Sequence, residues 1–94
     1  MATVPLPCDG AGTYKVPKAK DKVGFVLTGS CKFVSFNFVG GDPPGWTPDP
    51  KGSDPKKISY NYDGSPIPDA GYKFEYKTTA EVAMGNGTGV IKNP

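Results

Sequence analysis

Three observations predict an all-β fold for this sequence, specifically an antiparallel β-sandwich of immunoglobulin-like type. Short segments with alternating apolar and polar residues recur along the chain. Turn-rich stretches separate them, in a chain of 94 residues with 13 glycines and 11 prolines. No window has the period of an amphipathic helix. A small β-barrel is the alternative architecture for this pattern.

The chain is expected to form a single domain over residues 1–94, because its length is at the lower end of the range for one domain. Residues 1–20 are expected to be an irregular N-terminal lead-in with one short strand at most. Pro5, Pro7 and Pro17 lack a backbone N–H, so any strand in this segment should lie at the edge of a sheet.

The first clear strand pattern covers residues 22–28, where Val23, Phe25 and Leu27 share one face. Gly29-Ser30 then has the composition of a tight hairpin turn. Residues 31–39 are apolar on both faces, which predicts a central strand or one that is covered on both sides.

A long loop without regular structure is expected over residues 40–57, which contain five prolines and four glycines. Residues 58–62 alternate again, and after a turn-rich connection residues 72–79 give the clearest half-buried strand of the chain. Gly85-Asn86-Gly87 predicts a hairpin turn that leads into a last strand over 88–92.

The composition argues against several classes of function. The chain has no His, Arg or Gln, and all 11 basic residues are Lys. Catalytic triads and the usual metal sites therefore lack their ligands and bases, so we expect no enzyme, no catalytic residue, no metal and no cofactor. A net charge of +2 is too small to predict nucleic-acid binding, and no apolar run approaches the about 18 residues of a membrane span. No compartment follows from the sequence.

Cys8 and Cys31 are the only cysteines, 23 positions apart. In an oxidising compartment they would form a disulfide worth roughly 3 kcal/mol, which would fix the lead-in to the strand over 31–39. In a reducing compartment Cys31 would be a small buried residue and Cys8 a free thiol. The sequence leaves both alternatives open.

The leading functional hypothesis is a non-enzymatic structural or protein-interaction module that acts through a sandwich surface, with a protein partner or a second copy of the chain bound there. The alternative is a carbohydrate- or small-ligand-binding module. In that case Trp46, held among prolines in the long loop, would be an exposed stacking platform assisted by Tyr60 or Tyr62. The competing interpretation of Trp46 is a lid that folds back over the end of the core.

From Trp46 onward the order of features resembles that of a family of small bacterial proteins, the DP-EP family. The features are the Pro-rich loop with GWTP, the YKFEY strand, the Gly-Asn-Gly motif and the closing VIKNP. Asp-Pro pairs occur at Asp42-Pro43, Asp49-Pro50 and Asp54-Pro55, whereas neither Glu75 nor Glu81 precedes a proline. The resemblance implies a β-sandwich with a non-catalytic role and transfers no site residue.

Overall fold

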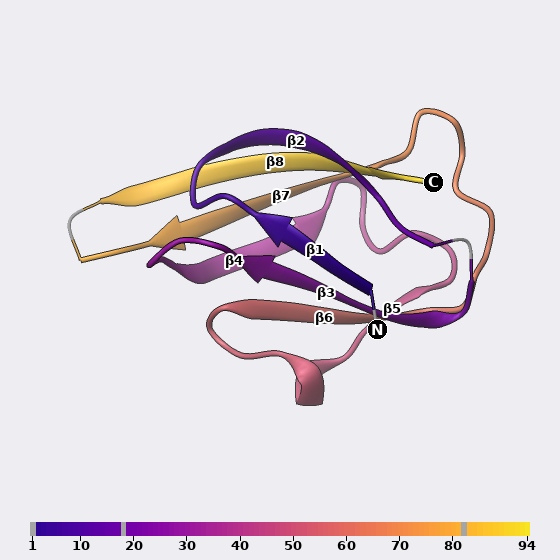
Figure 1. The fold of residues 1–94 in the computed structure, drawn as a ribbon, viewed down its shortest axis with the longest axis horizontal. Helices are drawn as coiled ribbons and strands as arrows, with labels where there is room; N and C mark the ends of the chain where they lie inside the picture. The colour runs from indigo at the N-terminus through magenta and orange to yellow at the C-terminus, as the bar shows by residue number, and fades with distance from the viewer. Residues whose placement is uncertain (1, 18, 82) are drawn as a thin grey trace.

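The structure is a computed structural model that describes residues 2–17, 19–81 and 83–94, and all its strands belong to two four-stranded sheets (Figure 1). The prediction of an all-β fold is therefore confirmed. One sheet has the strand order β1-β3-β6-β5 and the other has the order β2-β8-β7-β4. The elements are β1 (Ala2–Leu6), β2 (Gly10–Lys15), β3 (Asp21–Leu27), β4 (Lys32–Phe38), β5 (Trp46–Pro48), the short 3₁₀ turn η1 (Pro50–Gly52), β6 (Lys57–Tyr62), β7 (Tyr72–Thr79) and β8 (Met84–Lys92).

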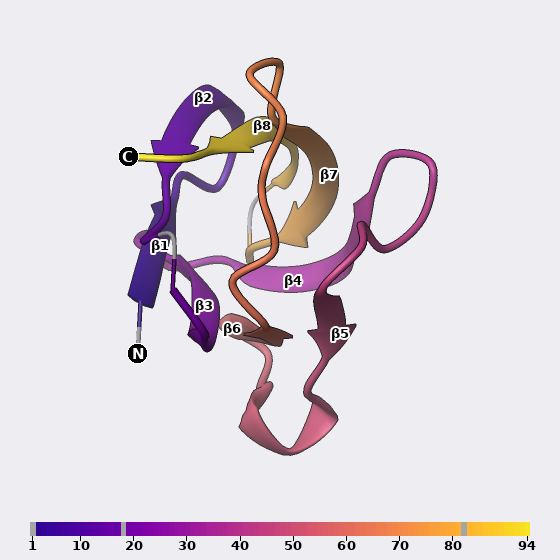
Figure 2. The ribbon, with the colours of Figure 1, turned by 90° about the vertical axis from the view of Figure 1, so that its right-hand side faces the viewer.

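The two sheets pack face to face around one core, as the end-on view in Figure 2 shows. The sandwich is mixed rather than antiparallel, which corrects the sequence-based expectation. β1 runs parallel to β3, and β2 runs parallel to β8. After β1 the chain crosses to the other sheet to form β2, and it then crosses back to form β3. β1 and β3 are therefore neighbours that no hairpin connects, and such a connection allows two strands to run parallel.

The lead-in is more regular than the sequence suggests, because residues 1–20 contain two strands, β1 and β2. Pro5 lies within β1 opposite Val26, and β1 is an edge strand, as the missing N–H requires. β2 pairs with the last strand over six residue pairs, from Gly10–Gly87 to Lys15–Lys92. The second strand and the last strand of the chain therefore lie side by side in one sheet.

The prediction of a central strand over 31–39 is wrong, since β4 is the edge strand of its sheet. The register shifts between Phe33 and Ser35, as it does at a β-bulge, and Val34 is 54% exposed. The bulge moves Phe36 to the same side as Phe33, and their rings lie 6.1 Å apart. A strict period of two therefore gave the wrong face for part of this strand.

The turn predictions also need correction. Gly29-Ser30 does not make a hairpin, because it connects β3 in one sheet to β4 in the other. Gly85 and Gly87 lie inside β8, and the β7–β8 connection falls earlier, where the N–H of Ala80 bonds to the carbonyl of Ala83. The long loop over 40–57 contains β5 and η1, whereas the strands expected over 58–62 and 72–79 are confirmed as β6 and β7.

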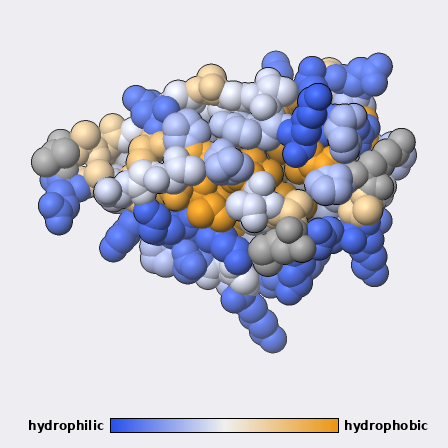
Figure 3. All heavy atoms as spheres, viewed as in Figure 1, coloured by the Kyte–Doolittle hydropathy of each residue, from blue (hydrophilic) through white to orange (hydrophobic). Residues whose placement is uncertain are grey.

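The core is rich in aromatic residues. Phe25 lies at its centre, with ring centroids 4.7 Å from Phe36 and 5.2 Å from Phe74. Figure 3 shows apolar residues gathered along the middle of one side of the molecule, between bands of hydrophilic residues. Among the residues described, no helix is long and apolar enough to cross a membrane.

Candidate functional site

The outer side of the sheet β2-β8-β7-β4 carries two recesses. Side chains alternate along each strand, so every second residue points away from the core. We call the outward set the outer face, and its members are Ala11, Thr13, Lys15, Lys32, Ser35, Asn37, Lys73, Glu75, Lys77, Thr79, Met84, Asn86, Thr88, Val90 and Lys92.

Two recesses adjoin on the outer face. The first, of about 570 Å³, extends from Ala11 and Thr13 on β2, across β8, to Lys73 on β7 and Val39 just after β4. The second, of about 370 Å³, continues along β7 and β8, and its lining includes Lys77. Glu75 and Thr88 line both, and they face one another across the β7–β8 ladder. Together the recesses form one strip that crosses the sheet.

Glycines on the inner side of β8 allow the strand beneath the recesses to pack closely against aromatic rings of the core. Gly87 and Gly89 are buried, and the aromatic rings of Tyr76 and Phe74 on β7 lie directly over them. A Cβ atom on Gly87 would lie 2.0 Å from Cζ of Tyr76, and one on Gly89 would lie 2.3 Å from Cζ of Phe74. The motif predicted to be a hairpin turn is therefore a packing motif, in which the missing side chains admit the rings.

Lysines dominate the charge of the outer face. Glu75 is its one carboxylate, and it lies between Lys73 and Lys77 on the same strand. The side-chain amide of Asn37 donates to Oε1 of Glu75 at 3.3 Å, from the neighbouring position on β4. The acid is thus held in the middle of the strip, where the two recesses meet.

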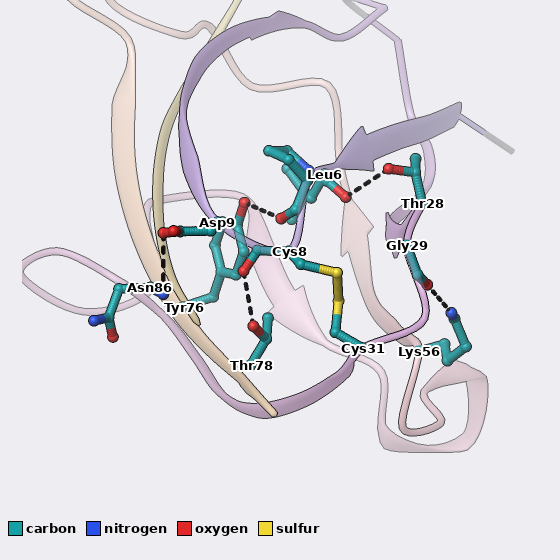
Figure 4. The surroundings of a disulfide bond; sticks show 11 residues. Leu6, Cys8, Asp9, Thr28, Gly29, Cys31, Lys56, Tyr76, Thr78 and Asn86 are labelled. Atoms are coloured by element: carbon teal, nitrogen blue, oxygen red, sulfur yellow. Dashed lines mark hydrogen bonds between the residues drawn. A yellow bond between two sulfur atoms is a disulfide. The ribbon is translucent and has the colours of Figure 1, made fainter. Parts of the chain in front are cut away.

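A disulfide and its hydrogen bonds fix one end of the strip (Figure 4). Cys8, in the β1–β2 connection, is bonded to Cys31, which precedes β4, with their Cα atoms 6.0 Å apart. The oxidised alternative left open by the sequence is therefore the one present. The Tyr76 hydroxyl donates to the carbonyl of Pro7, and Thr78 donates to the carbonyl of Cys8, both at 2.7 Å. These two hydrogen bonds tie the β1–β2 connection to β7, and the disulfide joins the same connection to the residue before β4.

Burial changes the acidity of the tyrosine in this corner. Desolvation of the hydroxyl is the largest cause, and the charges of Tyr14 and Asp9 add to it, so that the pKa of Tyr76 rises to about 12. Asp9 lies at the rim of the outer face, where its Oδ1 accepts the backbone N–H of Asn86 at 3.4 Å. Tyr76 therefore stays neutral and remains a hydrogen-bond donor up to strongly alkaline pH.

The structure brings Trp46, Tyr60 and Tyr62 together, but inside the protein. The Trp46 ring is stacked on Tyr62 with centroids 4.5 Å apart and meets Tyr60 at 6.2 Å. Trp46 is only 3% exposed, and both tyrosines are buried. Stacking on a sugar requires an open ring face. The arrangement matches the lid interpretation of Trp46 and does not supply the exposed platform.

Polar contacts hold this aromatic group in place. The Tyr60 hydroxyl donates to Oδ1 of Asp42 at 2.9 Å, and burial followed by this hydrogen bond raises the pKa of Tyr60. The Tyr62 hydroxyl donates to the carbonyl of Ser65. Nε1 of Trp46 has no hydrogen-bond partner among the residues described. All three side chains are therefore part of the core that supports β5 and β6.

Comparison with known proteins adds no functional assignment. No family model matches the sequence, and neither does any curated protein or any solved structure. The resemblance to the DP-EP family therefore stays a prediction. Within the described part of the chain, no three His, Cys, Asp or Glu side chains lie close enough together to hold a metal ion.

Proposed function

We propose that this chain is a non-enzymatic protein-interaction module that binds its partner through the outer face. The observation that carries the proposal is the pair of adjoining recesses, which together extend over all four strands of one sheet. A concave strip with apolar and polar members and a fixed backbone is typical of a binding surface. The disulfide corner and the ring-packed glycines hold that backbone in place.

The edges of the sheets favour binding by a face over binding by strand addition. β1 contains Pro5, β5 has only three residues and ends at Pro48, and β4 is interrupted by its bulge beside Lys32. Prolines, short strands, bulges and lysines all discourage the addition of a further strand at an edge. A partner, including a second copy of the chain, should therefore meet the outer face.

The non-enzymatic part of the proposal rests on the chemistry of the side chains. General acid–base work on a substrate usually needs two groups with different proton affinities, or a histidine. The recesses offer one carboxylate, Glu75, between two lysines, and the chain has no histidine. Such a group fits the binding of a charged partner better than proton transfer.

We also propose a more specific topology than a two-sheet sandwich. The order β1-β3-β6-β5 corresponds to strands A-B-E-D of an immunoglobulin domain, and β8-β7-β4 corresponds to G-F-C. We propose an immunoglobulin-like variant with β2 added beside the last strand. The parallel pairing of β1 with β3 is its departure from that topology.

The test compares two bulky substitutions. Thr88→Trp fills the centre of the outer face, and Asn61→Trp places the same side chain on the exposed side of β6 in the other sheet. Light scattering over a wide concentration range gives the native mass, and affinity capture with quantitative mass spectrometry gives the bound proteins. We expect Thr88→Trp alone to remove either the assembly or the bound protein.

The outcomes distinguish the kinds of partner. A native mass several times 9.9 kDa that falls to the monomer in Thr88→Trp identifies a second copy as the partner. Loss of one captured protein in Thr88→Trp but not in Asn61→Trp identifies a different chain. A monomer at all concentrations, with the same captured proteins for all three forms, would contradict the proposal.

A further inference from the structure

Charge is distributed unevenly between the outer face and the rest of the molecule. Of the ten lysines that the structure describes, five lie on the outer face together with one of the nine acidic residues, which leaves that face a surplus of four positive charges. The other five described lysines and the other eight acids give the remaining described residues a surplus of three negative charges. The small net charge of the chain therefore conceals a basic face.

The five lysines are spread along the length of the outer face, and two of them, Lys73 and Lys77, line the strip. Lys15 and Lys92 are direct neighbours across the β2–β8 ladder, at one end. Lys73 and Lys77 lie on either side of Glu75, and Lys32 is at the far end of β4. None of the five forms an ion pair with another described residue, whereas Lys22 in the other sheet has Asp49 at 3.3 Å. Such unneutralised like charges favour an oppositely charged partner.

We propose that the outer face binds an acidic, extended segment of a partner protein, aligned with β7 and β8. This inference rests on the proposed function and names the chemistry of the partner. Lys73 and Lys77 are four residues apart on one strand, which corresponds to about 14 Å. Carboxylates four residues apart in an extended segment have the same spacing and lie on the same side of that segment.

The residue between those two acids should be uncharged. It would face Glu75, which repels a third carboxylate at that position. Ala11, Val39 and Val90 give the first recess apolar surface, and Val39 is 57% exposed. An apolar side chain at the middle position would bury part of that surface. The recognised pattern is therefore acid, any residue, apolar residue, any residue, acid.

A protein segment fits this face better than a polyanionic nucleic acid or polysaccharide does. Single-stranded nucleic acids bind through aromatic rings that stack on bases, and the outer face has no aromatic member. The chain has no Arg for bidentate phosphate contacts. The negative charge of Glu75 in the middle of the strip also disfavours a continuous anion, while a segment with spaced acids avoids it.

The experiment uses a synthetic peptide of three Glu-Ser-Leu-Ser repeats with blocked ends. The control peptide has the same composition, with its glutamates adjacent. Backbone amide chemical shifts of the full chain are followed at peptide concentrations up to about 1 mM, which detects weak binding. We expect shifts confined to β7, β8 and their neighbours in that sheet, weaker binding of the control peptide, and loss of affinity as salt rises from about 50 to about 200 mM.

Charge-reversed variants test the role of the lysines. Lys73→Glu with Lys77→Glu should weaken binding by about tenfold or more. Lys51→Glu in η1 with Lys57→Glu in β6 makes the same change of net charge away from the outer face and should stay within about twofold. If the first variant does not give a folded spectrum, Lys73→Gln with Lys77→Gln replaces it.

Three results would overturn the inference: no shift with either peptide, equal affinity for both peptides, or equal weakening in both double variants. Preferential binding of a heparin fragment would also overturn it, because it would indicate a surface for sulfated polysaccharides. These failures are distinct from failure of the proposed function, since loss of a partner in Thr88→Trp does not depend on the charge of that partner.

Discussion

Replacing Gly87 with alanine should unfold a substantial fraction of the molecules under mild denaturing conditions. The new Cβ would lie 2.0 Å from Cζ of Tyr76, a separation at which one of the two groups must move. Tyr76 is 2% exposed, and its hydroxyl is bonded to the carbonyl of Pro7, so the ring has little room. Overpacking of a core costs about 1–3 kcal/mol, and loss of the hydrogen bond adds about 1 kcal/mol.

The expected loss for Gly87→Ala is therefore about 2–4 kcal/mol, which corresponds to a fall in Tm of about 8 °C or more for a domain of this size. Urea unfolding followed by the fluorescence of buried Trp46 measures it. Thr88→Ala is the matched control, because Thr88 neighbours Gly87 on β8 but points outward, and its cost should stay within about 0.5 kcal/mol.

A double-mutant cycle isolates the contact between Gly87 and Tyr76. In a Tyr76→Val background the aromatic ring is gone, so Gly87→Ala should cost less than about 1 kcal/mol. An equal cost of Gly87→Ala in both backgrounds would refute the argument that the ring occupies the place of the missing side chain.

Three further predictions concern the rest of the core. Replacing both Cys8 and Cys31 with serine should lower the free energy of unfolding by about 3 kcal/mol, because the bond closes a loop over 23 positions; an unchanged urea midpoint with and without reductant would contradict this. Trp46→Ala should cost about 3–5 kcal/mol while Trp46→Phe costs clearly less, since Nε1 has no described partner to lose; a folded Trp46→Ala that fails only to bind a sugar would revive the exposed platform. Because the pKa of Tyr76 is raised to about 12 from an ordinary value near 10, the stability it contributes should be complete below pH 10 and lost as pH rises through 12. Denaturant unfolding of wild type and Tyr76→Phe across this range checks it, and parallel curves would exclude Tyr76 as the source.

The sequence predicts best those strands whose side-chain alternation is uninterrupted. In β7, Phe74 and Tyr76 are buried while Lys73, Glu75 and Lys77 are exposed, so the period of two is visible from the residues alone. The same alternation places Lys73 and Lys77 on the exposed side of this strand. The alternation does not predict a binding surface at these lysines, because such a surface depends on which strands lie beside β7.

The incorrect predictions concern segments whose local composition is compatible with more than one structure. Gly-Asn-Gly is a common turn, but in β8 its glycines face the aromatic residues of β7 across the ladder. The two pairs, Tyr76 with Gly87 and Phe74 with Gly89, link residues 11 and 15 positions apart and are recognisable only once the register is known. Likewise the bulge at Val34 adds a residue that no alternation rule anticipates. The parallel pairs depend on crossings between sheets, which a segment-by-segment analysis does not specify.

The outer face and the core are two sides of the same two strands. Every outward residue of the strip on β7 and β8 alternates with an inward ring or glycine, so the packing of Tyr76 on Gly87 also sets the spacing of Glu75 and Thr88. The effects of a substitution on stability and on binding should therefore depend on the face that the side chain occupies. Charge changes at exposed lysines alter association and leave unfolding nearly unchanged, because isolated exposed charges contribute little to stability. An inward change such as Gly87→Ala should affect both, because it displaces the backbone that carries the outer side chains.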